Sequence, residues 1–187
     1  MLRKFYVKHF EIMKGENMEK RTGYLMGDQE LHLIGPELKV GDKAPDFNLL
    51  TKDMKPISLK DFDGKVKIIS AVPSLDTKVC ELETIRFNEE ADKLGQGLAV
   101  ITVSLDLPFA QQRFCGDKGI HNLTVASDYQ ERSFSKDYGV LIDELKLMNR
   151  SVFVLDKDNK FVHVEYVKQN TDFPDFDKAL EAAGKLL

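Results

Sequence analysis

The sequence predicts an α/β fold in which a central mixed sheet is flanked by helices and preceded by an N-terminal β-hairpin. Two apolar, β-branched segments, 66–72 and 98–105, have the composition of strands that are covered on both faces. The segment between them, 78–94, carries apolar residues at helical spacing. A strand, a helix and a strand in this order form a right-handed crossover, which makes the two strands parallel.

Length and composition are those of a globular domain. The chain has 187 residues, 42% hydrophobic and 31% charged, which suffices for one domain with a real core. Its net charge of −4 offers no basic field for nucleic acid, and no segment reaches the roughly 20 apolar residues of a membrane span. The four histidines are far apart, so we expect no metal and no cofactor. Without a secretory signal, a cytoplasmic location is expected.

Residues 1–19 differ from the rest of the chain in their mixed charge and scattered apolar residues. We expect this segment to be an N-terminal extension, disordered or forming a short helix, with no catalytic role. A translation start upstream of the true one is the alternative, since Met18 lies just before Arg21, where the strand and turn patterns become clear. Residues 20–187 are predicted to form a single domain.

The elements of this domain begin with a hairpin of segments 24–26 and 30–34, joined by a two-residue turn. Beyond the crossover unit, Pro108 is expected at the first position of a short helix that Gly116 ends. The other predicted elements are a strand at 47–50, a strand at 123–126, a helix at 131–138, a loop at 139–149, a hairpin of 151–155 and 161–167, and an amphipathic helix from about 174 to Leu187. This order is that of a thioredoxin-like fold with insertions.

Cys80 is the candidate reactive group because it lies in the first turn of the helix that follows the first crossover strand. Pro73 ends that strand and Thr77 is the predicted N-cap, so Cys80 falls at the third helical position. Unpaired backbone N–H groups and the helix dipole favour a thiolate there. The same spacing lets the Thr77 hydroxyl approach the sulfur. A buried core cysteine is the alternative, because Cys80 lies on the apolar face of the helix, and spacing alone favours neither.

Three motifs occur in the chain in a recognisable order. They are PSLDTKVC at 73–80, DLPFAQQRFC at 106–115 and RSVFVLD at 150–156. From about Arg21 to the C-terminus, the sequence resembles peroxiredoxins, and in particular the thiol peroxidase subfamily of the atypical two-cysteine type. Lys78 departs from the pattern, since most relatives have glycine at this position.

The resemblance implies a thiol-dependent peroxidase that reduces hydrogen peroxide and organic hydroperoxides to water and alcohols. Cys80 would be the peroxidatic cysteine and Cys115 the resolving cysteine, joined in an intramolecular disulfide that thioredoxin reduces. Thr77 would bond the sulfur, and Pro73 would shield it from water. Arg150 would be the active-site cation, whose fork of donors favours the thiolate. The resemblance also implies a homodimer.

The residues by themselves leave several alternatives. Arg150 would otherwise be a solvated strand end, and Cys115 a buried core residue. Arg86 matches the family pattern too, but at about 100° per residue it points away from the thiol. Because Cys115 ends a short helix of about two turns, we expect that helix to unwind partly before the sulfurs can meet.

Two other functions compete with the peroxidase. One is a redox sensor of thioredoxin fold that uses Cys80 as a switch. The other is a general disulfide oxidoreductase, against which the missing Cys-x-x-Cys pair counts. Repeated turnover with thioredoxin distinguishes a peroxidase from the sensor, and insulin reduction without peroxide consumption would indicate the oxidoreductase.

Overall fold

The computed structural model describes residues 19–187; residues 1–18, nearly all of the predicted extension, lie outside that part. Its centre is a seven-stranded mixed sheet. In spatial order the strands are β10 (Phe161–Tyr166), β9 (Ser151–Leu155), β5 (Val66–Ala71), β6 (Leu98–Ser104), β7 (Thr124–Ser127), β3 (Leu49–Thr51) and β4 (Pro56–Ile57). A 3₁₀ helix, η1 (Leu59–Phe62), precedes β5. The pairs β5–β6 and β6–β7 are parallel and the others antiparallel, which confirms the predicted crossover.

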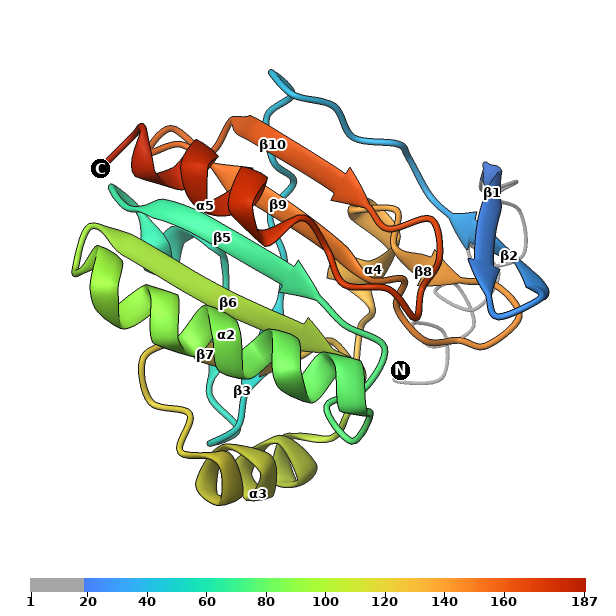
Figure 1. Cartoon of the computed structure of the whole chain (residues 1–187), viewed down its shortest axis with the longest axis horizontal. Coiled ribbons are helices and arrows are strands. Elements are labelled where there is room, and N and C mark those ends of the chain that lie inside the picture. Colours follow the sequence, from blue (N-terminus) through green and yellow to red (C-terminus); the bar gives the residue numbers. More distant parts are fainter. Residues whose placement is uncertain (1–18) are drawn as a thin grey trace, which may run out of the picture.

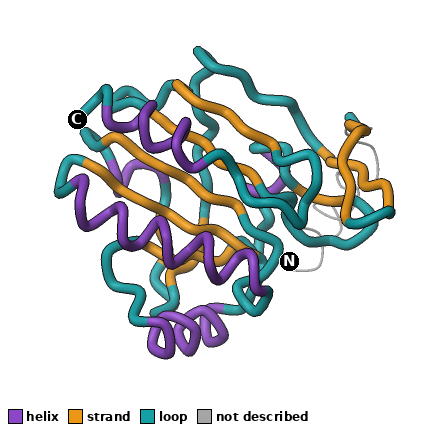
Figure 2. Tube along the Cα trace, in the orientation of Figure 1, coloured by secondary structure: helices purple, strands orange, loops and turns teal. Residues whose placement is uncertain are grey.

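Helices cover both faces of this sheet (Figure 1, Figure 2). On one face, α2 (Lys78–Leu94) and α5 (Phe176–Gly184) pack over an apolar cluster that includes Ile68 of β5. On the other face, α4 (Ser133–Asp137) packs over a second cluster, which includes Ile69. Alternate residues of β5 therefore enter opposite halves of the core. Every residue of β5 is buried, as predicted for a strand covered on both faces.

The predicted N-terminal hairpin is confirmed, and it belongs to a separate three-stranded sheet. It consists of β1 (Lys20–Met26) and β2 (Gln29–Ile34), joined by a turn that begins at Gly27, where φ is 61°. The third strand, β8 (Leu141–Ile142), pairs antiparallel with β2. The prediction of a plain loop at 139–149 is therefore wrong. Two residues are too few to show an alternating pattern, and their partner strand is distant in the sequence.

The hairpin is held against the main body by a close backbone contact at Gly139. A Cβ atom added there would lie 1.9 Å from the carbonyl oxygen of Pro36, and φ is 61°, so only glycine fits without strain. Arg21 of β1 donates a hydrogen bond to the Gly139 carbonyl. Its guanidinium carbon also lies 4.5 Å from the centre of the Tyr166 ring, a cation–π contact. These contacts give the hairpin a defined position beside the central sheet.

The helix that carries Cys115 is longer than predicted. It is α3 (Pro108–Lys118), and Pro108 occupies its first turn as expected. The predicted end at Gly116 is wrong, because the helix continues to Gly119, whose φ of 64° is left-handed. A glycine inside a helix costs only about 1 kcal/mol, whereas the left-handed C-terminal position strongly favours glycine. The helix therefore has about three turns, and Cys115 lies near its end.

Two further differences concern the ends of elements. The short strand predicted at 47–50 is β3, which begins at Leu49. Leu187 follows the end of α5 at Gly184 and is 46% exposed, so it does not extend the packed face of that helix. Periodicity locates elements well but not their last residues, because ends depend on capping contacts.

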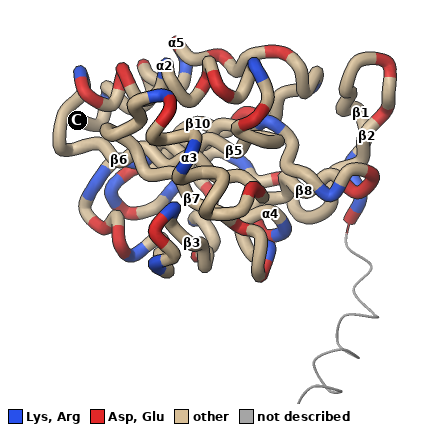
Figure 3. Tube along the Cα trace, turned by 90° about the horizontal axis from the view of Figure 1, so that it is seen from below, with Lys and Arg blue, Asp and Glu red and all other residues tan. Residues whose placement is uncertain are grey.

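Acidic and basic residues are interspersed along the described chain (Figure 3). Across residues 19–187, no helix combines the length and apolar character that crossing a membrane requires. The same residues contain no group of three or more His, Cys, Asp or Glu side chains that could hold a metal ion.

Candidate active site

Cys80 lies in the first turn of α2, just beyond the carboxyl end of β5. Thr77 has extended backbone angles (φ −103°, ψ 147°) and is the N-cap residue, so Cys80 occupies the third helical position, as predicted. The Cys80 side chain is fully buried. The Thr84 hydroxyl donates to the Cys80 carbonyl oxygen at 2.8 Å, one turn further along the helix. The sulfur is therefore held at a helix N-terminus, where the backbone favours negative charge.

The Thr77 hydroxyl is the first polar group beside this sulfur. Its oxygen lies 2.8 Å from Cys80 Sγ and 3.0 Å from the Ser74 carbonyl oxygen. A hydroxyl has one proton to donate. Beside a thiolate, the hydroxyl donates a hydrogen bond to the sulfur. Beside a neutral thiol, it accepts a hydrogen bond from the S–H group and donates one to the Ser74 carbonyl oxygen. Thr77 can thus satisfy both protonation states without moving.

Asp106 fixes the loop that leads into α2, a role that the sequence did not reveal. Its carboxylate accepts hydrogen bonds from the Ser74 hydroxyl at 2.7 Å and from the Leu75 backbone N–H at 2.8 Å. A third bond comes from the Ser104 hydroxyl at 2.8 Å, at the end of β6. The loop after β5 is thereby tied to the neighbouring parallel strand. In the sequence, the feature that could have indicated this role was a carboxylate just past the end of a buried strand.

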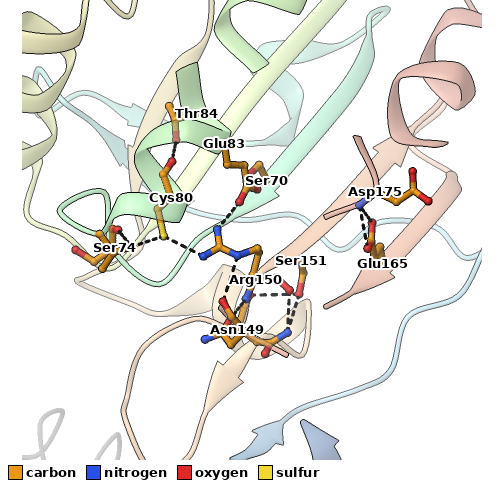
Figure 4. A network of polar contacts seen from close by, with 12 residues as sticks. Ser70, Ser74, Cys80, Glu83, Thr84, Asn149, Arg150, Ser151, Glu165 and Asp175 are labelled. Atoms are coloured by element: carbon orange, nitrogen blue, oxygen red, sulfur yellow. Dashed lines mark hydrogen bonds and ion pairs between the residues drawn. The ribbon is translucent and has the colours of Figure 1, made fainter. Parts of the chain in front are cut away.

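Arg150 brings a positive charge to the sulfur from the start of β9 (Figure 4). Its Nη2 lies 3.5 Å from Cys80 Sγ, and Nη1 forms an ion pair with the Glu83 carboxylate. The Ser70 hydroxyl of β5 donates to the other Glu83 oxygen at 2.7 Å. Arg150 is only 2% exposed, so the alternative of a solvated strand end is wrong. A chain of polar contacts thus runs from Ser70 through Glu83 and Arg150 to Cys80.

The charge of Arg150 persists although it is buried. Burial opposes that charge, but the neighbouring Glu83 and Cys80 together raise the pKa of Arg150 above its ordinary value. Burial also raises the pKa of Glu83, while the guanidinium and the Ser70 hydroxyl act in the opposite direction. The sequence analysis missed Glu83. It lies one helical turn after Cys80, on the same buried face, and this acidic residue on an apolar face was the available signal.

Cys115 shares an apolar cluster with Cys80, although the two come from different helices. The other buried members of this cluster are Val72, Leu75, Phe114, Ile120 and Val125. Both cysteines are free thiols, and Cys115 is 2% exposed. Burial raises the pKa of Cys115, which Lys52 offsets only in part. In this conformation Cys115 is therefore a neutral thiol.

The remaining candidates are Pro73 and Arg86. Pro73 is buried at the start of the loop that leads to Cys80. Arg86 points away from the sulfur, as expected from its helical position. It forms an ion pair with Asp177 of α5 at 3.0 Å and stacks on the Phe176 ring at 4.1 Å. Arg86 thus joins α2 to α5, and Arg150 is the arginine that contacts Cys80.

Comparison with known proteins agrees with this geometry. The family described as Redoxin matches residues 39–180. The chain belongs to the Redoxin family. This Redoxin-family chain is 52% identical to a thiol peroxidase of Bacillus subtilis over 155 residues, which are 83% of this chain and 92% of that protein. It is 50% identical to a thiol peroxidase of Staphylococcus saprophyticus over 154 residues, which are 82% and 93% of the two chains.

Solved structures of related proteins show the same fold. A peroxiredoxin-like protein from Aquifex aeolicus superposes with a TM-score of 0.83 at 42% identity, covering 92% of this chain and all of that one (100%). A thiol peroxidase from Chromobacterium violaceum gives 0.78 at 26% identity, covering 87% and 95%. The predicted thioredoxin-like fold and the resemblance to thiol peroxidases of the peroxiredoxin family are therefore confirmed.

Replacing Glu83 tests the buried ion pair. We expect Glu83→Ala to lower the free energy of unfolding by about 3–5 kcal/mol, because it leaves the Arg150 guanidinium buried without its counter-ion. Urea denaturation followed by circular dichroism measures the change. Glu81→Ala is the matched control in the same helical turn, since its ion pairs with Lys78 and Lys118 are at the surface and contribute little. Equal losses in the two variants would contradict the importance of the buried pair.

Proposed function

We propose that this chain is a thiol-dependent peroxidase that reduces hydroperoxides at Cys80. The observation that carries the proposal is the convergence of the Thr77 hydroxyl and the Arg150 guanidinium on one sulfur at a helix N-terminus. The family and its relatives named thiol peroxidase support the same activity. Hydrogen peroxide and organic hydroperoxides are the substrates, with water or an alcohol as product.

In the first step the Cys80 thiolate attacks the terminal oxygen of the hydroperoxide. An S–O bond forms and the O–O bond breaks, so the sulfur is oxidised to a sulfenic acid and the peroxide is reduced. The departing oxygen takes up a proton and leaves as water or an alcohol. Arg150 presents N–H donors to the oxygen that gains charge, and Thr77 keeps the sulfur oriented. Pro73 shields the sulfur from bulk water.

In the second step Cys115 resolves the sulfenic acid. Its thiolate attacks the Cys80 sulfur, an S–S bond forms, and the hydroxyl of the sulfenic acid leaves as water. The buried Cys115 thiol is neutral in the reduced structure, so it must gain solvent access to react. We infer that the last part of α3 unwinds to provide this access.

The contacts of α3 suggest where unwinding begins. Its first half is held to the sheet by the buried Gln111, whose amide donates to the Ser104 hydroxyl at 3.1 Å and to the Ala126 carbonyl at 3.0 Å. Its end is held by two backbone bonds to the Cys115 carbonyl, by the apolar contacts of Phe114 and Cys115, and by the ion pair of Lys118 with Glu81 at 3.1 Å. Surface ion pairs of this kind are worth at most about 1 kcal/mol. The end of α3 therefore opens more easily than its beginning.

A dithiol must then reduce the disulfide, and we assign this role to thioredoxin. Reduction transfers two electrons from the dithiol, which becomes a disulfide while Cys80 and Cys115 return to thiols. Two free cysteines that cycle between thiol and disulfide suit a reducing compartment. We therefore place the protein in the cytoplasm, which fractionation of cells would test.

We also propose that the chain forms a homodimer near the active site. Large apolar side chains are exposed on the elements next to the Cys80 loop, namely Leu82, Leu107, Phe109 and Phe173. Phe109 is the most exposed of them at 66%. Exposed apolar side chains that gather in one region mark contact surfaces, whereas those scattered singly do not.

Substitution of the two cysteines tests the peroxidase mechanism. We expect Cys80→Ser to abolish peroxide consumption with thioredoxin, and Cys115→Ser to consume one peroxide per chain without cycling. A peroxide assay coupled to thioredoxin reductase, with mass spectrometry of the oxidised wild type, measures both. Full cycling by Cys115→Ser would contradict the intramolecular disulfide. Insulin reduction without peroxide consumption would indicate a disulfide oxidoreductase, and a single oxidation without thioredoxin turnover a redox sensor.

Stiffening α3 tests the unwinding step. A Cβ atom at Gly116 meets nothing within 4 Å, so Gly116→Ala stabilises the helix by about 0.5–1 kcal/mol. We expect disulfide formation to slow by about two- to fivefold, with sulfenic acid formation unchanged. Stopped-flow fluorescence or rapid quenching separates the two steps. Gly184→Ala in α5 is the control, because its Cβ also meets open space. An unchanged rate of disulfide formation in a stabilised Gly116→Ala protein would argue against unwinding.

A charge at Phe109 tests the homodimer. We expect Phe109→Glu to convert a dimer into a monomer, because it places a carboxylate in the apolar contact surface. Sedimentation velocity at micromolar concentration measures the assembly. Leu187→Glu, at an exposed apolar residue near the C-terminus, should leave the dimer intact. A monomeric wild type under these conditions would refute the proposal.

A further inference from the structure

Asn170 contacts Arg150 at two points, although it belongs to none of the sequence motifs. It lies in the linker between β10 and α5 and is 1% exposed. Its Oδ1 accepts a hydrogen bond from the Arg150 backbone N–H at 2.6 Å, and its backbone carbonyl accepts one from Arg150 Nε at 3.3 Å. Asn170 therefore holds both the backbone and the guanidinium of the same arginine.

The orientation of the Asn170 amide follows from this contact. Because the Arg150 backbone N–H is a donor, the atom that faces it must be the acceptor Oδ1 and not the Nδ2 amino group. Nδ2 is buried and has no hydrogen-bond partner among the described residues. Buried amide groups are normally paired, so one left unpaired indicates that the contact with Arg150 decides how this side chain sits.

The three contacts of the guanidinium come from only two parts of the chain. Nη1 contacts Glu83 and Nη2 contacts Cys80, and both of these residues lie on α2. Asn170 supplies the contact to Nε. Within residues 19–187 it is the one hydrogen-bond partner of the guanidinium outside α2. It therefore restrains the planar group at Nε, from a segment other than the helix that holds Nη1 and Nη2.

Asn170 is in turn held by the N-terminal hairpin, which lies at one edge of the molecule (Figure 1). The Asn170 N–H donates to the Leu25 carbonyl at 2.7 Å, and the Leu25 N–H donates to the Lys168 carbonyl at 2.8 Å. The Gln169 side chain forms two bonds with the backbone of Gly27, at 3.0 and 3.1 Å. β1 thus fixes the linker from which Asn170 reaches the active site.

We propose that Asn170 is a positioning residue that keeps the Arg150 guanidinium against the Cys80 sulfur, with the hairpin holding Asn170 in place. The inference rests on the proposed function, since it concerns the arginine that serves Cys80 in peroxide reduction. It assigns the N-terminal hairpin a part in the chemistry through its bonds to the linker that carries Asn170.

Asn170→Leu tests the proposal, because leucine has a similar size but no acceptor for the Arg150 N–H. The backbone carbonyl that faces Nε then loses the side-chain bond that fixes its position beside Arg150. We expect the single-turnover oxidation of Cys80 by hydrogen peroxide to slow by at least about tenfold, since misplacement of a catalytic group by about 1 Å can cost a hundredfold. The pH at which the rate reaches half its maximum should also rise, because the thiolate loses part of its cation. A merely structural role would leave this pH profile unchanged. Stopped-flow measurements over a pH series report both.

The control for lost stability is Val100→Ala, in the apolar cluster under α2 and α5. It should lower the Tm and leave the oxidation rate and its pH profile as in the wild type. If Asn170→Leu does not fold, Asn170→Ala is measured in its place. A wild-type pH profile in the folded Asn170 variant would overturn the proposal.

A double-mutant cycle shows whether Asn170 acts through Arg150. In an Arg150→Lys background, Asn170→Leu should slow oxidation by less than about twofold, because the planar fork is already absent. Losses that multiply independently would overturn the proposal. If the wild-type chain is not oxidised at Cys80 by peroxide, the proposed function fails. If the wild type is active and the cycle is additive, only the role of Asn170 fails.

Discussion

The buried positive charge of Arg150 is the constraint on which the geometry of the site depends. A guanidinium removed from water costs several kcal/mol unless it is paired and hydrogen-bonded. Here Glu83 supplies the opposite charge, and Cys80 and Asn170 accept from the remaining nitrogens. Since the carboxylate and the sulfur are one turn apart on α2, the position of that helix decides both contacts together. The contacts that stabilise the buried charge of Arg150 therefore also place that charge beside the Cys80 sulfur.

The fold brings α2 to this position through the crossover between β5 and β6. Both strands end at the same edge of the sheet, where Asp106 after β6 accepts bonds from the loop after β5. Arg150 enters the same edge from β9, which is antiparallel to β5. A two-stranded hairpin is marginal alone, so β1 and β2 depend on their contacts at Gly139 and in the linker.

The two cysteines share a cluster but differ in their surroundings. Cys80 has polar partners on both sides, from Thr77 and Arg150, in a rigid network. Cys115 has apolar neighbours, and burial keeps its thiol neutral. It lies near the end of a helix whose ion pair with α2 is at the surface and weak. The surroundings of Cys80 are thus firmly constrained, whereas the helix end that carries Cys115 can open, as a reaction in two steps requires.

Patterns between neighbouring residues were enough to predict α2, its N-cap at Thr77, the place of Cys80 and the parallel pair β5–β6. Helix capping and strand periodicity depend on residues a few positions apart, so a single sequence contains them. The sequence could not indicate that Arg150 meets Glu83, 67 positions away, or Asn170, 20 positions away. These pairings, like the short strand β8, arise only when distant segments pack together. The tertiary structure alone decided them, because side chains choose partners by distance in space.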